Sequence, residues 1–568
     1  MTRRQASGAR HSLKQDTNQK VTFAKSASAP FVTNSDIEIP IGKRTLFYRF
    51  FEIITPVLTF SVIILAVILS WINAFWGAVY ILVWVILFFV KGLGVLYSMV
   101  LGRNNFYKSI TIDWHRRLLD LQEGKVSHHD KTEFLYEKHQ RCVALYTDQK
   151  RIEMPIEKVY HLVIMAAYNE SFEVIDATMK SLVDTTYNKD RMIICLAYEQ
   201  RGGEDIAKTA RLLKTKYQDS FADFVTVEHP DGLPNEVIGK GGNITYAGKY
   251  MSQYLKQQGI DSRLVIVTTL DSDNKPHPMY FDYVTYEYVI YKDRKQLSFQ
   301  PVSLFLNNIW DAPAPARVIA TGNSFWNLIC SVRPYALRNF ASHSQPMDAL
   351  EDMNFWSVRT IVEDGHQYWR SYFHFNGHYA VVPIYLPIYQ DAVMSETYRK
   401  TLKAQFMQLR RWAYGVSDVP YVALNLAKRH TDNMFKGVVK LLMLMESVVS
   451  LGTSSIIIAF GGWLPLLFNR AAHHSIEAHQ LPITISFIQK IAMVGIIAMV
   501  VFSIIMLPPK PKRYKKTRYL MMVLQWALIP ITSILYSSLS SLYSQFRLMT
   551  GRYLDKFDVT EKTLVKDK

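Results

Sequence analysis

Cysteine is scarce in this sequence, and the scarcity limits what can stabilise the fold. The three cysteines among 568 residues, Cys142, Cys195 and Cys330, are far apart and form no spacing typical of a metal site. We therefore expect neither a disulfide framework nor a cysteine-bound metal. The first 45 residues are polar and basic, so we also expect no cleavable signal peptide at the N-terminus.

Acidic residues are fewer than basic ones, which gives a formal net charge of +17. Such an imbalance can indicate a nucleic-acid-binding protein. Here, however, the basic clusters flank long apolar runs, and residues 510–518 (KPKRYKKTR) hold six Lys or Arg and no acid. This distribution is typical of the cytoplasmic loops of membrane proteins. We therefore expect no nucleic-acid partner and expect membrane lipids to contact part of the chain.

Five apolar segments near the two ends of the chain are long enough to cross a bilayer as helices. They are residues 53–71, 74–90, 438–460, 484–507 and 519–543. The arm of residues 1–45 carries eight Lys or Arg against three Asp or Glu, which places it in the cytoplasm. The same rule places residues 102–436 and the basic run 510–518 inside. Pro530 leaves open whether the last segment spans the membrane or is re-entrant.

Few polar residues interrupt these segments. Lys440 lies near the start of the third segment and can extend to the headgroups. Glu446 lies deeper, and we interpret it as a carboxyl paired with a neighbouring helix rather than as part of a substrate path. His473, His474 and His479 fall in the predicted outer loop, where we expect a solvated loop rather than a metal site.

From His161 onward the pattern changes to alternating strand and helix signals. Short apolar runs such as residues 161–166 (HLVIMA) alternate with segments of helical spacing such as residues 171–185. This alternation predicts a parallel sheet with helices on its faces. The central part of the chain is thus predicted to be an α/β domain.

Polar residues follow the predicted strands at the points where they end. Residues 166–171 (AAYNES) follow the first strand, Glu199 the second, and Asp271 and Asp273 the fourth, while Lys240 lies between the third and fourth. Open α/β sheets bind ligands at this carboxyl edge. Two close carboxylates repel each other unless a cation lies between them. The set suits a nucleotide diphosphate with a divalent cation, and the glycines around position 240 lack the Walker A spacing of many ATPases.

Four motifs in order resemble those of the family-2 glycosyltransferases with a GT-A fold. They are AYNE (167–170), DSD (271–273), VEDGHQYWR (362–370) and QLRRW (408–412). More narrowly, the chain looks like the membrane-integrated subgroup that includes cellulose and hyaluronan synthases, over roughly residues 160–420. The resemblance implies an α/β GT-A catalytic domain with a nucleotide-sugar-binding, mostly parallel sheet, flanked by transmembrane α-helices.

The resemblance also implies a role for each matching residue. Asp364 would be the catalytic base. The residues implied for nucleotide-sugar binding are Ala167, Tyr168, Glu170, Glu199, Lys240 and Asp271. The residues implied for the acceptor and the diphosphate are Glu363, Gln408, Arg411 and Trp412. Asp273, with Asp271, would bind a Mg²⁺ or Mn²⁺ ion.

The sequence departs from the family pattern at some of these positions. Glu199 stands where the family usually has Asp, and Val362 stands where it usually has Thr. A second acidic pair, Glu351 and Asp352, competes for the role of base. We prefer Asp364 because its separation from Q-x-x-R-W matches the family, and we expect the other pair on the surface of a helix.

Each motif also has a plainer interpretation. The aspartates of DSD could form an Asx-type turn, and Lys240 could be a solvated surface amine. Residues 398–416, which include Q-x-x-R-W, could be only an amphipathic helix at the membrane interface. Residues 322–326 (GNSFW) could line the acceptor entrance or form a packing turn.

The predicted function is that of an inverting, metal-dependent hexosyltransferase. It would move a sugar from a nucleotide-sugar donor, in the first instance a UDP-sugar, to an acceptor hydroxyl during polysaccharide synthesis, and export or regulatory subunits could join it. The alternative acceptor is a membrane lipid that receives a single sugar. An inactive scaffold or a nucleotide-sensing membrane protein is the alternative of another class. We expect an integral protein of the cell (inner) membrane with a cytoplasmic catalytic domain.

The predicted domain order follows from these assignments. It is a basic cytoplasmic arm (1–48), a transmembrane hairpin (49–101), a cytoplasmic linker (102–159), a GT-A catalytic domain (160–395), interfacial helices with Q-x-x-R-W (396–436), C-terminal transmembrane helices (437–545) and a tail (546–568).

Overall fold

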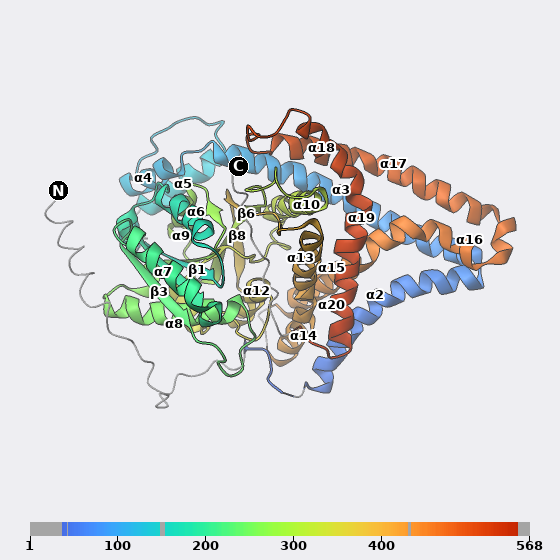
Figure 1. The fold of residues 1–568 in the computed structure, drawn as a ribbon, viewed down its shortest axis with the longest axis horizontal. Helices are drawn as coiled ribbons and strands as arrows, with labels where there is room; N and C mark the ends of the chain where they lie inside the picture. The colour runs from blue at the N-terminus through green and yellow to red at the C-terminus, as the bar shows by residue number, and fades with distance from the viewer. Residues whose placement is uncertain (1–36, 43, 148–153, 430–432, 555–568) are drawn as a thin grey trace. The chain divides into compact units, whose positions relative to one another are not determined.

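The computed structural model describes residues 37–42, 44–147, 154–429 and 433–554 (Figure 1). The chain forms two compact units that alternate along the sequence. The first unit comprises the described residues of Met1–Ile39, Lys108–Pro301 and Arg338–Ile388. The second comprises those of Pro40–Tyr107, Val302–Leu337 and Tyr389–Lys568. The predicted basic arm lies mostly, and the predicted tail partly, outside the described residues.

The first unit is centred on an eight-stranded sheet of order β3-β2-β1-β4-β7-β6-β8-β5. The strands are β1 Tyr160–Ala167, β2 Met192–Glu199, β3 Asp223–His229, β4 Val265–Asp271, β5 Lys275–Pro276, β6 Leu297–Leu304, β7 His343–Pro346 and β8 Ala380–Tyr389. The pairs β1–β2, β2–β3 and β1–β4 are parallel, whereas β7 is antiparallel to both β4 and β6. The α/β prediction is confirmed, and the sheet is mixed beyond the four strands that the sequence indicated.

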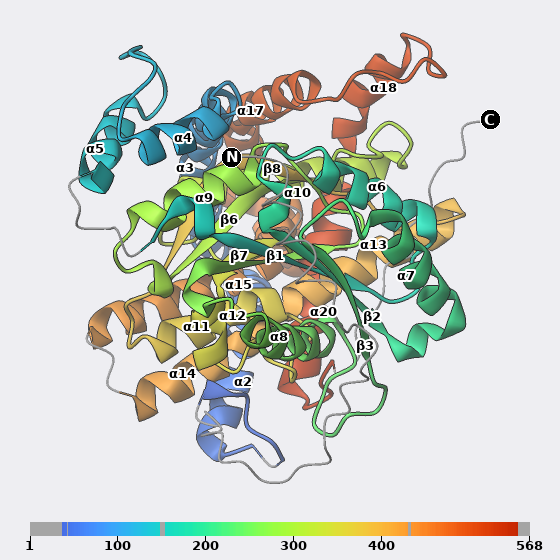
Figure 2. The same cartoon turned by 90° about the vertical axis from the view of Figure 1, so that its left-hand side faces the viewer.

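Helices cover both faces of this sheet (Figure 2). They include α6 Phe172–Val183, α7 Gly203–Tyr217, α8 Lys240–Gln257, α9 Tyr280–Ile290, α11 Met347–Asp352 and α12 Glu363–His374. Val163 and Met165 of β1 belong to the core that includes α6 and α7, while Leu162 and Ile164 belong to the core that includes α8. A strand covered on both faces needs an almost continuous apolar run, which is the pattern that β1 shows.

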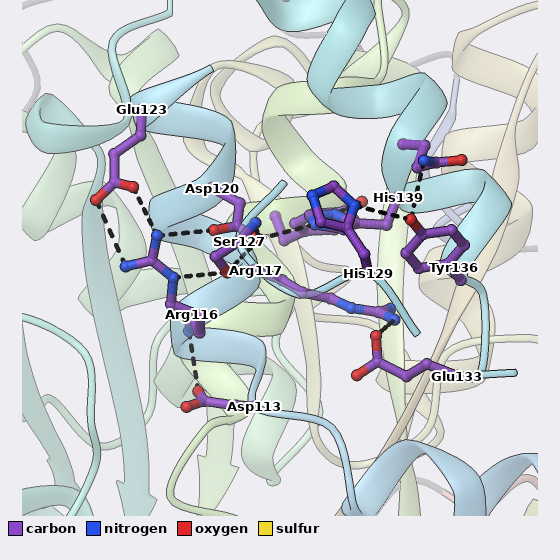
Figure 3. A network of polar contacts seen from close by, with 12 residues as sticks. Asp113, Arg116, Arg117, Asp120, Glu123, Ser127, His129, Glu133, Tyr136 and His139 are labelled. Atoms are coloured by element: carbon purple, nitrogen blue, oxygen red, sulfur yellow. Dashed lines mark hydrogen bonds and ion pairs between the residues drawn. The ribbon is translucent and has the colours of Figure 1, made fainter. Parts of the chain in front are cut away.

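Two further helices pack against α9. They are α4 Trp114–Glu123 and α5 Tyr136–Thr147. The ring of Trp114 stacks on Tyr283 of α9 with 3.4 Å between centroids. A buried polar network joins the two helices, with His139 Nε2 3.1 Å from Asp120 Oδ2 (Figure 3). Burial lowers the pKa of His139, although Asp120 opposes this. This stretch, treated as a linker in the sequence analysis, therefore packs as part of the first unit.

The candidate membrane helices lie almost entirely in the second unit. Five helical segments are long and apolar enough to cross a membrane: Leu46–Ile72 (α2), Ala74–Ile110 (α3), Met434–Phe468 (beginning with α15), Ile476–Ile505 (α17) and Arg518–Met549 (α18 to α20). Three other helices of this unit are α10 Ala314–Ser331, α13 Tyr398–Ala413 and α14 Asp418–Lys428. Within the unit α2 packs against α14, α15 and α20. The five predicted apolar segments are thus confirmed as helices of sufficient length.

The second predicted segment is longer than expected. The helix continues through Lys91 to Ile110, so Lys91 is not at its end. Its ammonium instead pairs with the carboxylate of Glu446 on α15. The interpretation of Glu446 as a carboxyl paired with a neighbouring helix is therefore confirmed, with Lys91 of α3 as its partner.

The structure also bears on two local alternatives that the sequence left open. The last segment remains helical across Pro530, through 3₁₀ and π turns, so it contains no re-entrant break. The α-helical pattern is interrupted around Pro530 by a 3₁₀ turn before it and a π turn after it, which accommodate the missing N–H. Residues 322–326 lie inside α10, so they form neither a turn nor a loop.

Candidate functional site

The carboxyl ends of the parallel strands lie level with one another at one edge of the sheet. Ala167 of β1 is paired in register with Tyr198 of β2, and Ala166 is paired with Asp271 of β4. Glu199 follows Tyr198 as the last residue of β2. The predicted residues Ala167, Glu199 and Asp271 therefore share the edge at which α/β sheets bind ligands.

Lys240, the first residue of α8, points into this edge. Its Nζ donates to Asp271 Oδ1 at 2.6 Å and to the carbonyl oxygen of Ala341 at 2.8 Å. Burial lowers the pKa of Lys240, but the negative charges of Asp271, Glu363 and Asp364 outweigh it and raise that pKa above its usual value. The side chain is only 10% exposed, so it is not the solvated amine that the plainer interpretation proposed.

Glu363 and Asp364 form the first turn of α12, and this turn meets the beginning of α8. A Cβ added to Gly241 would lie 3.1 Å from the Cβ of Glu363, so the two helix ends are in direct contact. Glu363 is buried, whereas Asp364 is half-buried and its Oδ1 accepts from the backbone N–H of Gly365 at 2.7 Å. Backbone N–H groups at a helix N-terminus favour an ionised carboxylate. The structure thus brings this acidic pair to the same place as Lys240.

Arg201 joins the loops that follow β1 and β2, and no sequence motif indicated this residue. Arg201 Nε donates to Glu199 Oε2 at 2.7 Å, and its guanidinium lies 4.8 Å from the ring centroid of Tyr168. Glu170 Oε2 accepts from the backbone N–H of Tyr168 at 2.7 Å. Gly202 is required here, because a Cβ would lie 1.8 Å from the carbonyl oxygen of Tyr168. Burial raises the pKa of Glu199, and Arg201 opposes the shift.

Two more polar residues of the site come from segments that the motifs do not cover. Asn243 Nδ2 of α8 donates to the carbonyl oxygen of Ala197 at 3.0 Å and so ties α8 to the end of β2. His343 begins β7, where burial, and to a smaller extent the charge of Lys240, lowers its pKa to about 4. Asn243 follows GKGG directly and could have been considered, whereas nothing in the sequence indicates that His343 lies beside β4.

The DSD motif forms a tight turn after β4. The backbone N–H of Asn274 donates to the carbonyl oxygen of Asp271 at 3.0 Å, and Thr178 Oγ1 donates to that of Ser272 at 2.7 Å. Asp273 is 6% exposed, and the amide group of Asn274 lies 3.1 Å from its Oδ1. The turn is therefore held by its own backbone and by α6, while the carboxylate of Asp271 faces Lys240.

The donor set limits the kind of metal that this edge could bind. Among the described residues, no group of three or more His, Cys, Asp and Glu side chains is arranged to hold a metal ion. Mg²⁺ commonly takes one or two carboxylates from the protein and its other ligands from substrate phosphates and water. A divalent ion here would take Asp273 and Asp271 from the protein and its other ligands from a diphosphate and water.

The competing acidic pair is engaged elsewhere. Glu351 Oε1 lies 3.1 Å from Lys256 Nζ, and Asp352 Oδ2 lies 2.7 Å from Lys295 Nζ. Both residues are in α11, and Asp352 is exposed. This is the helical surface position expected for them, and it gives no support to their assignment as the base.

Gln408, Arg411 and Trp412 lie on α13 in the second unit. This helix packs along α20, where Ser544 Oγ donates to the carbonyl oxygen of Arg410 at 2.7 Å. Trp412 is 39% exposed. The Q-x-x-R-W helix is thus fixed to the last apolar segment, as an interfacial helix would be.

The chain matches no protein-family model and no curated protein sequence. Among solved structures it is similar to the mannosyltransferase PcManGT from Pyrobaculum calidifontis in complex with GDP-Man and Mn²⁺. The identity is 13% and the TM-score 0.35, over 66% of this chain and 85% of that chain. It is also similar to residues 1–349 of S. aureus TarS in complex with UDP-GlcNAc, with 12% identity and a TM-score of 0.29, over 59% of this chain and 90% of that chain. TM-scores this low do not establish a common fold.

Proposed function

We propose that this protein is a membrane glycosyltransferase with a GT-A catalytic unit, which transfers a sugar from a nucleotide-sugar to an acceptor hydroxyl. One arrangement carries the proposal. Lys240, Asp271 and the Glu363–Asp364 pair come from distant parts of the sequence and interact at the carboxyl edge of one sheet. Carboxylates gathered at one sheet edge are ligands that a divalent cation takes together with the oxygens of a diphosphate.

The nucleotide end of the donor would lie against the loops that follow β1 and β2. The ring of Tyr168 and the backbone beside Ala167 supply a flat surface for the base. Glu199 is positioned by Arg201 and would contact the base, which is the role that the resemblance gives it. Asp271 would accept from a ribose hydroxyl or complete the shell of the metal, while Lys240 keeps it oriented. Glu170 holds the loop by its bond to the backbone of Tyr168.

Asp364 is the residue that we assign as catalytic base. It would accept the proton of the acceptor hydroxyl as the oxygen attacks the anomeric carbon, which contributes roughly 10²–10⁴-fold in rate. With one base and no second nucleophile, the reaction is a single displacement that inverts the anomeric centre. Glu363 is buried behind it and would orient the acceptor side of the site.

Asp273, with Asp271, would hold Mg²⁺ or Mn²⁺. When bound, this ion acts as a Lewis acid that offsets the charge developing on the leaving diphosphate. The resemblance implies that Arg411 binds the diphosphate, Gln408 the acceptor end and Trp412 the acceptor sugar, and the ring of Trp412 is 39% exposed.

Polysaccharide synthesis at the cell membrane is the role that we propose for this reaction, with the catalytic unit on the cytoplasmic side. The basic run 510–518 before the last candidate span supports this orientation. A membrane lipid is the second candidate acceptor, because five candidate spans are few for a polysaccharide channel built by one chain. Product length separates the two.

The test is an assay of the purified full-length chain in detergent with a panel of nucleotide-sugars and Mn²⁺. We expect diphosphate release with at least one donor, and about a hundredfold loss in Asp273→Asn. Asp261→Asn is the matched control, because among the described residues that carboxylate bonds to nearby Arg263, before β4. Absence of turnover with every donor, or equal activity of the two variants, would overturn the proposal.

A further inference from the structure

The second unit contains a cavity that shares no residue with the proposed catalytic site. Its volume is about 630 Å³, and it lies between the start of α10 and residues 518–528 of the last candidate span. Met521, Leu524 and Leu528 form much of its wall. Met521 and Leu524 are 55% and 56% exposed, so the apolar wall continues onto the outer surface of that helix. On a membrane helix, such a surface contacts acyl chains.

Two guanidinium groups line this cavity, together with the polar side chains of Asp311, Tyr398 and Gln525. Arg317 of α10 is 3% exposed, and its Nε donates to Gln525 Oε1 at 2.5 Å. Arg518 donates from Nη2 to the carbonyl oxygen of Trp310 at 2.6 Å, and its buried Nε has no hydrogen-bond partner among the described residues. The hydrogen bonds of both arginines go to neutral oxygens, and Arg317 Nη1 likewise donates to the carbonyl oxygen of Ala312 at 2.6 Å.

The positive charge of the cavity is not neutralised by the protein around it. Within the described ranges neither Arg317 nor Arg518 forms an ion pair. The acidic residue of the wall, Asp311, is already engaged by Arg513 at 2.8 Å and by the hydroxyl of Tyr514 at 2.6 Å. Burial, and then the neighbouring charge of Arg518, lowers the pKa of Arg317 to about 10.

Arg518 stands at the junction between a basic run and a candidate membrane span. Arg518 ends the run 510–518, with six basic residues and no acid, and begins the candidate span Arg518–Met549. A basic cluster directly before a membrane helix lies at the level of the lipid phosphates. A cavity with arginines at this level and an apolar wall below it matches a molecule with an anionic head and a hydrocarbon tail.

We propose that this cavity binds a lipid phosphate, with the phosphate between Arg317 and Arg518 and the hydrocarbon chain along Met521 and Leu524. The ligand class is a phosphate ester at the head of a membrane lipid. Arginine suits this role, since its planar fork of donors binds phosphate oxygens in pairs. The inference does not depend on sugar transfer, because the cavity and the proposed catalytic carboxylates have no residue in common.

The experiment measures lipid binding to the full-length chain in nanodiscs of phosphatidylcholine with and without phosphatidylglycerol. Native mass spectrometry then counts the phosphatidylglycerol retained after transfer to detergent. We expect Arg518→Gln to weaken retention about tenfold, the loss of one charge-assisted hydrogen bond. Lys516→Gln removes the same charge from an exposed position outside the cavity and should change retention less than twofold. Equal losses in both variants would assign binding to the surface charge of the run and overturn the proposal.

A second measurement keeps the proposal testable if Arg518→Gln folds poorly. A photoreactive phosphatidylglycerol is crosslinked to the unmodified chain, and the labelled peptides are mapped. Labels within residues 311–317 or 518–528 support the proposal, and labels confined to other segments overturn it. Inorganic phosphate is the remaining arm: if it displaces the lipid and raises the melting temperature as much as the lipid does, the cavity is a simple anion site and the lipid assignment is wrong.

Discussion

Gly241 and Glu363 lie so close that a side chain at position 241 would not fit between the beginnings of α8 and α12. A Cβ at position 241 would lie 2.5 Å from the carbonyl oxygen of Ser357 and 3.1 Å from the Cβ of Glu363. Lys240 and Asp364 are the sequence neighbours of these two residues. The contact therefore sets the separation between the amine that holds Asp271 and the carboxylate that we assign as base.

Gly241→Ala should separate these helix ends. The backbone oxygen of Ser357 cannot move aside cheaply, so we expect a loss of about 1–3 kcal/mol in stability and a lower rate of sugar transfer. Gly365→Ala is the matched control, because nothing lies within 4 Å of its added Cβ and alanine favours the helix. Thermal unfolding of the two purified variants measures their stability, and diphosphate release measures their rate of sugar transfer. Equal melting temperatures would contradict the tight contact.

Asp364→Asn should abolish transfer while leaving nucleotide binding intact. The amide cannot accept the proton of the acceptor hydroxyl, so the rate should fall roughly 10²–10⁴-fold. Asp352→Asn alters the competing acidic pair, whose carboxylate is bound to Lys295 on the surface, and should retain full activity. Turnover and fluorescent-nucleotide binding are measured on the same samples. The opposite pattern, with Asp352 essential and Asp364 dispensable, would reverse the assignment.

Stability of the first unit should fall in mild acid. Burial lowers the pKa of His161 to about 3, and it lowers the pKa of His277 and of His343 to about 4. A histidine with a depressed folded pKa is neutral in the fold and binds its proton on unfolding, so its contribution is complete above about pH 6.5 and declines as the pH falls below that value. Each histidine should cost about 2 kcal/mol by about pH 5.

The pH dependence can be assigned with single variants. His161→Gln keeps a group that can bond to Thr285 Oγ1, now 2.7 Å from the imidazole, but removes the titration. The slope of stability against pH should then fall by about 1.4 kcal/mol per pH unit. His128→Gln, at an exposed position, should leave the slope unchanged. Melting temperatures measured across the pH range give this slope for each variant. If the slope of stability against pH is unaltered in His161→Gln, His161 does not contribute to the loss of stability in acid.

How far the sequence predicts this molecule depends on whether the relevant interactions are local. The parallel strands, their helices and the apolar segments were predictable because each repeats a pattern within a few residues. The position of Glu199 and Asp271 at one edge followed from their place at the ends of predicted parallel strands, and that of Lys240 from its place between two such strands. The partners of these residues did not: Arg201 bonds to Glu199 through a turn, and His343 reaches the site through an antiparallel strand that no local signal announces. The Lys91–Glu446 pair, which joins two apolar helices, could be inferred only in part.

The last prediction concerns Lys91 and Glu446 of the second unit. Both side chains are about half exposed on helices long enough to span a bilayer, and Ser450 Oγ bonds to each of them. Lys91→Leu leaves an unpaired carboxylate on an apolar surface and should destabilise the protein by about 3 kcal/mol. The double variant Lys91→Leu with Glu446→Leu removes both charges and should recover most of that loss. Thermal unfolding in nanodiscs compares the three chains. If the single and double variants melt at the same temperature, the pair contributes nothing to the packing of α3 on α15 and lies in water.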